Sequence, residues 1–136
     1  TSKRLIHANT VWDTAKRTSS LRVPNIPNYI EHAAYKCYVF VEASNLKEGW
    51  DRDRIMAEIN SLGVPCFSGS CSEVYLEKAF DGTGFRPSER LSVAKEIGET
   101  SLMFLVHPTL TDKEISMTCD ALEKVMSQAQ LPAIGY

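Results

Sequence analysis

The sequence predicts a small α/β (α+β) domain: a three-stranded, mainly antiparallel sheet with helices packed mainly on one face, preceded by a long N-terminal lead-in helix. Side chains at 35–43 alternate as in a strand. Apolar residues recur at helical spacing in 51–62 and in 115–129. A chain of 136 residues has the usual size of one domain and holds a core without metal or disulfides.

The first segment is predicted to be a helix over residues 3–20. Leu5, Ala8, Trp12 and Ala15 follow one another at steps of three or four residues, which places them on one stripe. Two prolines, at positions 24 and 27, then prevent helix formation. We therefore expect residues 21–31 to form a linker.

The middle of the chain is predicted to form a strand, a helix and a strand. Tyr35–Ala43 has two largely apolar rows, so both faces of that strand should be at least partly covered. A helix over Asp51–Leu62 begins with Asp51 as its cap and ends before Gly63. Val64–Phe67 then forms a short strand.

The second half contains two loops, two helices and the third strand. Gly69–Ser72 and Asp81–Gly84 are predicted loops, with one or two helical turns over Glu73–Phe80 between them. A helix is predicted from Pro87 to Ile97, with Leu91, Ala94 and Ile97 inward and Gly98 as its stop, and a strand follows over Ser101–Val106. A capping box of Thr111 and Glu114 opens the last helix. The buried stripe of that helix is predicted to be Ile115, Cys119, Leu122, Val125, Met126 and Ala129. A sheet covered on one side has an open face and open edges, which indicates a missing partner.

Composition excludes several classes of partner. The net charge is −2, so no basic field attracts nucleic acid or an anionic membrane. No apolar run approaches the ~20 residues that a membrane helix needs. The first residues do not resemble a secretory signal, and the four cysteines are expected to be reduced thiols, so we expect a cytoplasmic protein. Cys66 and Cys71 are followed by no second Cys/His pair at zinc spacing, so no metal site is predicted.

The loop around Ser70 is the first candidate binding site. Free backbone N–H groups before a helical turn suit a phosphate or carboxylate, although a serine there is also a common helix cap. Glu73 and Tyr75 are candidates to orient a polar ligand. The alternative is that Glu73 supports its own turn and that Tyr75 packs its ring.

Two arginines and two histidines are further candidates. Arg86 and Arg90 have the donor geometry for bidentate binding of a carboxylate or phosphate, or they are solvated surface residues. His32 and His107 are candidate acids, bases or ligands, or edge residues with one bonded nitrogen. No nucleophile–base spacing and no glycine-rich phosphate loop is present, so no catalytic residue is predicted.

Four segments, in order, resemble one known family. They are Arg4 with Ala8 and Trp12, the strand segment His32–Val41, Arg52-Asp53 with Ile55, Ile59 and Leu62-Gly63-Val64, and Leu105–Thr111 with Glu114-Ile115. In this order and spacing they resemble the C-terminal small domain of the DegT/DnrJ/StrS family. Members are pyridoxal-phosphate (PLP) dependent nucleotide-sugar aminotransferases of the aspartate-aminotransferase fold, type I.

The resemblance implies that this chain is one part of a larger enzyme. Residues 1–31 would be the lead-in helix and linker from a missing large domain, and residues 32–136 the small domain. The intact enzyme, usually a homodimer, would transfer an amino group, usually from glutamate, to a nucleotide-linked keto-sugar, as in polysaccharide or lipopolysaccharide biosynthesis. In the family the large domain carries the Schiff-base lysine and most PLP contacts. We therefore expect PLP in the full-length enzyme, none bound to this fragment, and no transamination by this chain alone.

The resemblance also implies where this chain would meet the substrate. The candidates are Ser70, Glu73 and Tyr75, with Arg86. Ser68–Tyr75 replaces a His/Tyr-Pro-rich loop of the family, and Val106 stands where the family often has proline. Two other classes remain open: a stand-alone module that binds a small molecule in the Gly69–Gly84 loops, and a protein-interaction domain that offers its open sheet face.

Overall fold

A computed structural model describes residues 1–132 as helices packed on a four-stranded antiparallel sheet. The sheet order is β1-β2-β4-β3. The elements are α1 (Ser2–Ala15), β1 (Leu21–Arg22), β2 (Cys37–Val41), η1 (Ala43–Asn45), α2 (Arg52–Ser61), β3 (Cys66–Phe67), η2 (Val74–Leu76), η3 (Lys78–Phe80), α3 (Ser92–Thr100), β4 (Ser101–Phe104) and α4 (Asp112–Ala129), where η marks a 3-10 turn.

The predicted strand count was wrong by one, while the antiparallel arrangement is confirmed. The extra strand, β1, lies inside the predicted linker and pairs Leu21 with Val41 and Arg22 with Phe40. A strand of two residues is too short to show an alternating pattern, so only its pairing with β2 reveals it. It extends the sheet on the edge opposite β3.

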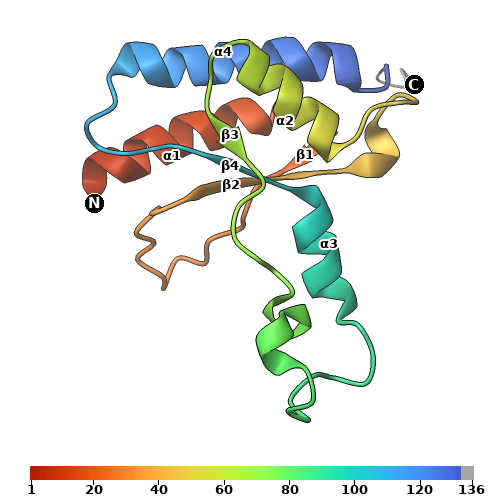
Figure 1. Ribbon diagram of the computed structural model, residues 1–136. Helices are drawn as coiled ribbons and strands as arrows, with labels where there is room; N and C mark the ends of the chain where they lie inside the picture. Colours follow the sequence, from red (N-terminus) through yellow and green to blue (C-terminus); the bar gives the residue numbers. More distant parts are fainter. Residues whose placement is uncertain (133–136) are drawn as a thin grey trace.

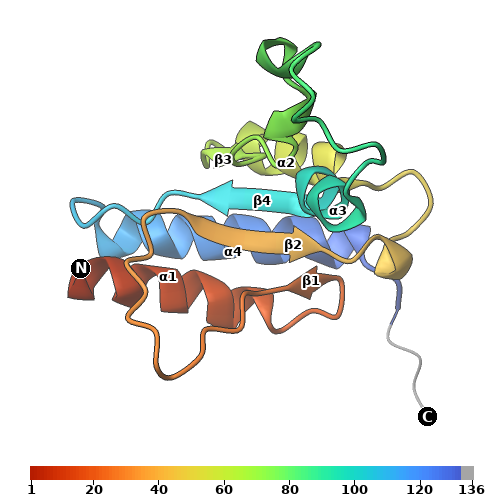
Figure 2. The same ribbon diagram turned by 90° about the horizontal axis from the view of Figure 1, so that it is seen from below.

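Three helices cover one face of the sheet, as Figures 1 and 2 show for α1, α2 and α4. The strand residues that face them are fully buried: Cys37, Val39, Leu102 and Phe104 each have a relative exposure of 0%. Register explains this layer, because Val39 lies opposite Leu102 and Cys37 opposite Phe104. Burial of these apolar side chains, with those of the three helices, supplies the stabilising core.

The opposite face of the sheet is open and partly aromatic. Tyr38 and Phe40 lie there side by side, with ring centroids 6.3 Å apart, and the guanidinium of Arg22 covers Phe40 at 4.7 Å. Met103 lies opposite Tyr38 in the register. All four side chains keep some exposure, so no layer of the described chain closes this face.

Helix ends follow the predicted local signals. The Asp51 carboxylate accepts the backbone N–H of Arg54 at 2.7 Å, and Gly63 has the left-handed φ of 80° that ends α2. The predicted capping box between Thr111 and Glu114 is present at the start of α4. α1 is shorter than predicted and ends at Ala15. It packs along α4. The boundary between a lead-in segment, residues 1–31, and a small domain, residues 32–136, stays a prediction.

α3 differs most from its prediction. It begins at Ser92 rather than Pro87, and Gly98 lies inside it rather than after it. Leu91 and Ile97, predicted to point inward, are 50% and 39% exposed. The periodic pattern is real, but the helix lies on the side of the sheet away from α1, α2 and α4, where no described element covers it (Figure 1).

No helix in the described residues, 1–132, has the length and apolarity required to cross a membrane.

Candidate functional site

Residues 68–100 form a projecting arm, which hangs from the sheet on the side away from α1, α2 and α4 (Figure 1). The arm contains the two 3-10 turns η2 and η3, which confirm the predicted helical turns, and it returns to the sheet through α3. None of its residues is buried, in contrast to the helical layer. All four predicted site residues lie in this arm.

Ser70 is held against the open face of the sheet. Its Oγ accepts the Lys36 ammonium at 2.7 Å and the Tyr38 hydroxyl at 3.2 Å, and its backbone N–H donates to the Tyr38 oxygen at 3.2 Å. Ser70 therefore does not cap a helix. Gly69 permits this contact: its φ is +90°, and a Cβ there would lie 2.5 Å from Cε1 of Tyr38.

Glu73 is the centre of a charged cluster. Both of its carboxylate oxygens accept N–H groups of Arg90, at 2.6 and 2.5 Å, and Oε1 also accepts the Tyr75 hydroxyl at 2.7 Å. Its side chain is only 12% exposed. The hydrogen bonds from Arg90, with a smaller contribution from Tyr75, lower the pKa of Glu73 from 4.5 to about 2, so the carboxylate is ionised at neutral pH.

Tyr75 and Arg86 are both bonded to the arm itself. The Tyr75 oxygen accepts the backbone N–H of Leu91 at 2.9 Å, and desolvation, followed by the bond to Glu73, raises the pKa of this phenol. The Arg86 guanidinium donates to the carbonyls of Tyr75, Leu76 and Glu77, at 2.9 to 3.3 Å, and to the Asp81 carboxylate at 2.6 Å. Arg86 thus ties the 3-10 turns together.

A groove of about 470 Å³ lies between the start of the arm and α3. Ser70 and Glu73 both line it, whereas Tyr75 and Arg86 are not among its lining residues. Its charged lining residues have both signs: Arg52, Glu73, Glu77, Arg90, Lys95 and Glu99. Hydroxyls, cations and carboxylates in one groove suit a polar ligand that presents both hydroxyl and anionic groups.

Prediction from sequence missed two residues near this groove. Lys36 holds Ser70, and it shares a row of the alternating strand pattern with Tyr38, so the signal was present. Arg52 lines the groove with a side chain only 14% exposed, and its Nη1 donates to the Ser101 carbonyl at 3.0 Å. A bond between residues 49 positions apart leaves no trace in the sequence pattern. Arg90, a predicted anion binder, instead pairs with Glu73.

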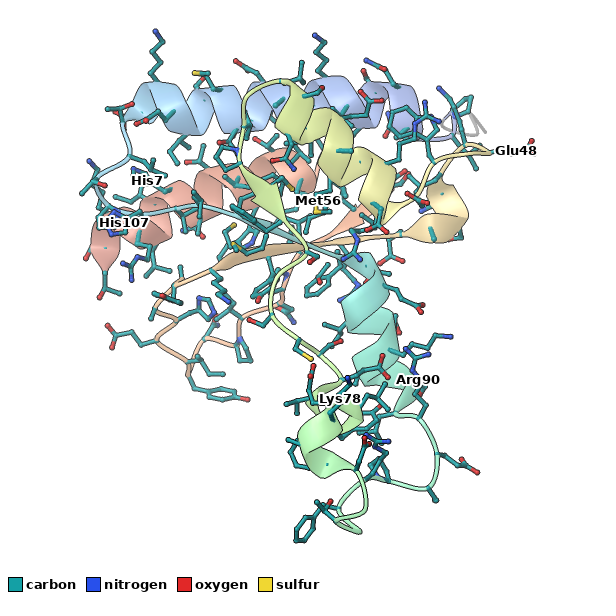
Figure 3. All side chains as sticks on the ribbon, viewed as in Figure 1. His7, Glu48, Met56, Lys78, Arg90 and His107 are labelled. Atoms are coloured by element: carbon teal, nitrogen blue, oxygen red, sulfur yellow. The ribbon has the colours of Figure 1, made fainter. Side chains whose placement is uncertain are left out.

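The histidines lie outside the groove. His107 bonds through Nδ1 to the Thr109 hydroxyl at 2.7 Å, and in Figure 3 it lies far from Arg90. The His32 ring lies 5.9 Å from that of Trp12, and its Nδ1 accepts the N–H of Ala34 at 3.0 Å. Both therefore have local structural contacts.

Two buried cysteines and the arrangement of possible metal ligands bear on thiol and metal chemistry. Burial raises the pKa of Cys37 and of Cys66 to about 12, which keeps both thiols protonated and unreactive. Among residues 1–132 no group of three His, Cys, Asp or Glu side chains has the arrangement to hold a metal ion.

The lysines do not fit the role of holding PLP. A Schiff-base lysine needs a cleft that excludes water and an acidic partner for the pyridine nitrogen. Every lysine except Lys36 is exposed, and the ammonium of Lys36 bonds to the Ser70 hydroxyl. None of these lysines therefore has the setting that a Schiff-base lysine needs.

Comparison with solved structures relates the chain to aminotransferases. An aminotransferase from Psychrobacter cryohalolentis is 54% identical and superposes with a TM-score of 0.88 over 93% of this chain and 34% of its own. The aminotransferase TlmJ from Streptoalloteichus hindustanus (18% identity, TM-score 0.77) matches 93% of this chain and 31% of its own length. A DegT DnrJ EryC1 StrS aminotransferase from Brucella abortus (18%, TM-score 0.70) matches 90% and 30%.

This chain thus spans about a third of the length of each of these proteins. No protein-family model matches the sequence, and no curated protein matches it either. The two more distant structures share the fold, and the Psychrobacter enzyme adds sequence identity over the same region. The resemblance inferred from the sequence is confirmed: nearly the whole chain is similar to about a third of solved aminotransferases, one of which is a DegT DnrJ EryC1 StrS aminotransferase.

Proposed function

We propose that this chain is the C-terminal small domain of a PLP-dependent aminotransferase that transfers an amino group, from glutamate, to a nucleotide-linked keto-sugar for polysaccharide or lipopolysaccharide synthesis. The observation that carries the proposal is the 54% identity to an aminotransferase across 93% of this chain. Residues 1–31 would lead in from the large domain, and residues 32–136 would form the small domain.

Two apolar surfaces, one half-buried and one exposed, support a position against a larger partner. One is the open sheet face with Tyr38, Phe40 and Met103. The other is the α3 stripe, which we define as Leu91, Val93, Ala94 and Ile97. Exposed apolar patches of this kind mark interaction sites in soluble proteins. We propose that the large domain of the same enzyme, acting as a cytoplasmic homodimer, covers part of these surfaces.

The arm would form part of the active-site wall. In this proposal Ser70 and Glu73 face the substrate, because both line the groove, and Tyr75 and Arg86 fix the loop that carries them. The ionised Glu73 would accept a sugar hydroxyl, and Ser70 would donate to an oxygen of the sugar or of the donor carboxylate. PLP, held by the large domain, supplies the electron sink for amino transfer.

A chimera tests the proposal. This chain replaces the third of the Psychrobacter cryohalolentis aminotransferase to which it is similar, and amino transfer from glutamate to a panel of nucleotide-linked keto-sugars is assayed. We expect amino-sugar product from the chimera and none from the 136-residue chain alone. A chimera that folds and binds PLP yet transfers no amino group to any of them, while the parent enzyme does, would contradict the proposal.

A further inference from the structure

Arg90 joins the two ends of the projecting arm. Its Nε and Nη2 donate to both oxygens of Glu73, 17 residues earlier, at 2.6 and 2.5 Å. The Tyr75 hydroxyl adds two bonds to the same junction, donating to Glu73 and accepting the N–H of Leu91. Three hydrogen bonds thus link the outgoing segment of the arm to its return, two from Arg90 to Glu73 and one from Leu91 to Tyr75, and Figure 3 shows Arg90 beside α3 within this region.

Arg86 organises the tip of the arm in the same way. One guanidinium donates to three successive carbonyls, those of Tyr75, Leu76 and Glu77, and to the Asp81 carboxylate. The first two carbonyls belong to η2, and the third, which also accepts the backbone N–H of Phe80, lies between η2 and η3. Its Nε and Nη2 are committed to these acceptors, so this edge of the guanidinium serves the arm itself.

The shape of the arm depends on these polar contacts, because no residue between 68 and 100 is buried. Most surface ion pairs contribute little to stability. The Glu73–Arg90 pair differs because it is bidentate and because the Glu73 side chain is only 12% exposed. By contrast, buried apolar residues hold α4 in place, whereas polar contacts hold the arm.

We propose that Arg90 and Arg86 are positioning residues, which hold the arm in the conformation that presents Ser70 and Glu73 to the groove. The identity of the ligand that binds in the groove depends on the proposed function, whereas the positioning role does not. The positioning role itself concerns the order of the arm, and it is measurable on the 136-residue chain without substrate.

Amide hydrogen exchange tests the role directly. Arg90→Gln removes the charge and the guanidinium while keeping a polar side chain, and we expect exchange at Leu91 and Leu76 to accelerate roughly five- to tenfold. Exchange at Val39 and Leu102, in the paired strands of the core, should not change. Arg90→Lys should restore only part of the protection, because an ammonium does not reproduce the bidentate geometry. Arg86→Gln should accelerate exchange at Leu76 and leave the core unchanged.

A matched control is Arg54→Gln, which removes an exposed arginine of α2 paired with Glu58 at 4.0 Å. It should leave arm exchange unchanged. Unaltered exchange at Leu91 and Leu76 in Arg90→Gln would overturn the proposal, and so would equal acceleration in arm and core. If Arg90→Gln fails to fold, Glu73→Gln serves instead, since it breaks the same pair from the other side.

A second readout separates positioning from substrate binding in the chimera. If Arg90 acts through loop order, Arg90→Gln and Glu73→Gln should each accelerate arm exchange in the absence of substrate. The double variant should then exchange no faster than either single one. Additive acceleration would show two independent roles and would overturn the positioning role of Arg90. An inactive chimera leaves this measurement intact, so the two proposals fail separately.

Discussion

α4 and α3 are both amphipathic helices, yet only α4 buries its apolar residues. In α4, Leu122, Val125 and Met126 are 1–3% exposed, because α1 and α2 pack against it. In α3 the stripe residues Val93 and Ile97 are 65% and 39% exposed, and none is buried. The comparison teaches that periodicity reports which side of a helix is apolar, and that only the rest of the molecule determines whether that side is covered.

The core and the arm should differ most in how much the loss of a phenylalanine side chain lowers the free energy of unfolding. Phe104 is completely buried in β4, whereas Phe85 in the arm is 80% exposed. We expect Phe104→Ala to lower the free energy of unfolding by about 3–5 kcal/mol and Phe85→Ala to change it by less than about 0.5 kcal/mol. Urea unfolding measures both, and similar losses would contradict the division into core and arm.

The contact between arm and sheet should respond next. Gly69→Ala places a Cβ against Tyr38 at a φ of +90°, so we expect a cost of about 1–3 kcal/mol or a displaced loop. Gly82→Ala is the control, because that position also has a positive φ but has nothing within 4 Å. NMR spectra should show that the contacts of Ser70 with Lys36 and Tyr38 are lost in Gly69→Ala and kept in Gly82→Ala, which would sharpen the comparison of core and arm. Equal effects of the two substitutions would remove the role assigned to the Tyr38 ring.

The cap of α4 should have a smaller effect, confined to the core. Thr111→Ala removes the hydroxyl that accepts the Glu114 N–H, one half of the capping box, and should cost about 1 kcal/mol. The backbone N–H and hydroxyl of Thr111 lower the pKa of Glu114, so this cap stabilises the fold above the ordinary Glu pKa and is lost as pH falls through the lower folded value. Thermal unfolding of wild type and of Glu114→Gln, which has no carboxylate, should converge at the acidic end between pH 7 and 3. A constant difference over the whole range would contradict this assignment.

Glu73 supplies the corresponding pH test in the arm. Its pKa is lowered to about 2, so its ion pair contributes above the ordinary value of 4.5 and is lost as pH falls towards 2. The NMR shift of its carboxyl carbon should stay constant from pH 6 to about 4. In Arg90→Gln the titration should move up towards 4.5. A midpoint near 4.5 in the wild type would show that the pair does not form in solution.

The smallest expected effect concerns the α3 stripe in the isolated chain. Ile97→Lys should change the free energy of unfolding by less than about 0.5 kcal/mol, because the side chain is exposed and does not belong to the hydrophobic core. In the chimera the same change should impair assembly, since it places a charge in the proposed contact with the large domain. A large loss of stability in the isolated chain would mean that α3 packs on its own core.

Much of the fold was predictable because local signals determine it. The Asp51 cap, the Gly63 stop and the Thr111/Glu114 box predict where α2 and α4 begin and where α2 ends. The alternation that predicts β2 is an equally local feature, because its rows face opposite sides of the sheet. β1 was missed, since two residues show no period and their pairing with β2 depends on distant residues.

The start of α3 was misplaced for a related reason. Pro87 and Ser88 are typical of a helix start, but the bonds of Arg86 to the 3-10 turns and of Leu91 to Tyr75 hold this segment out of a helix. Such long-range bonds leave no pattern in the sequence. The site was partly predictable: Ser70 and Glu73 came from one loop and line one groove, whereas the partner of Glu73 lies 17 residues away.

The central claim is that the arm lacks a core of its own because the rest of an aminotransferase covers it. Hydrogen exchange of α3, measured in the isolated chain and in the chimera, tests this most directly. We predict that exchange of Ser92–Thr100 slows at least about tenfold in the chimera, while that of β2 and β4 changes little. Equal exchange of α3 in both would show that its stripe stays exposed and would contradict the account.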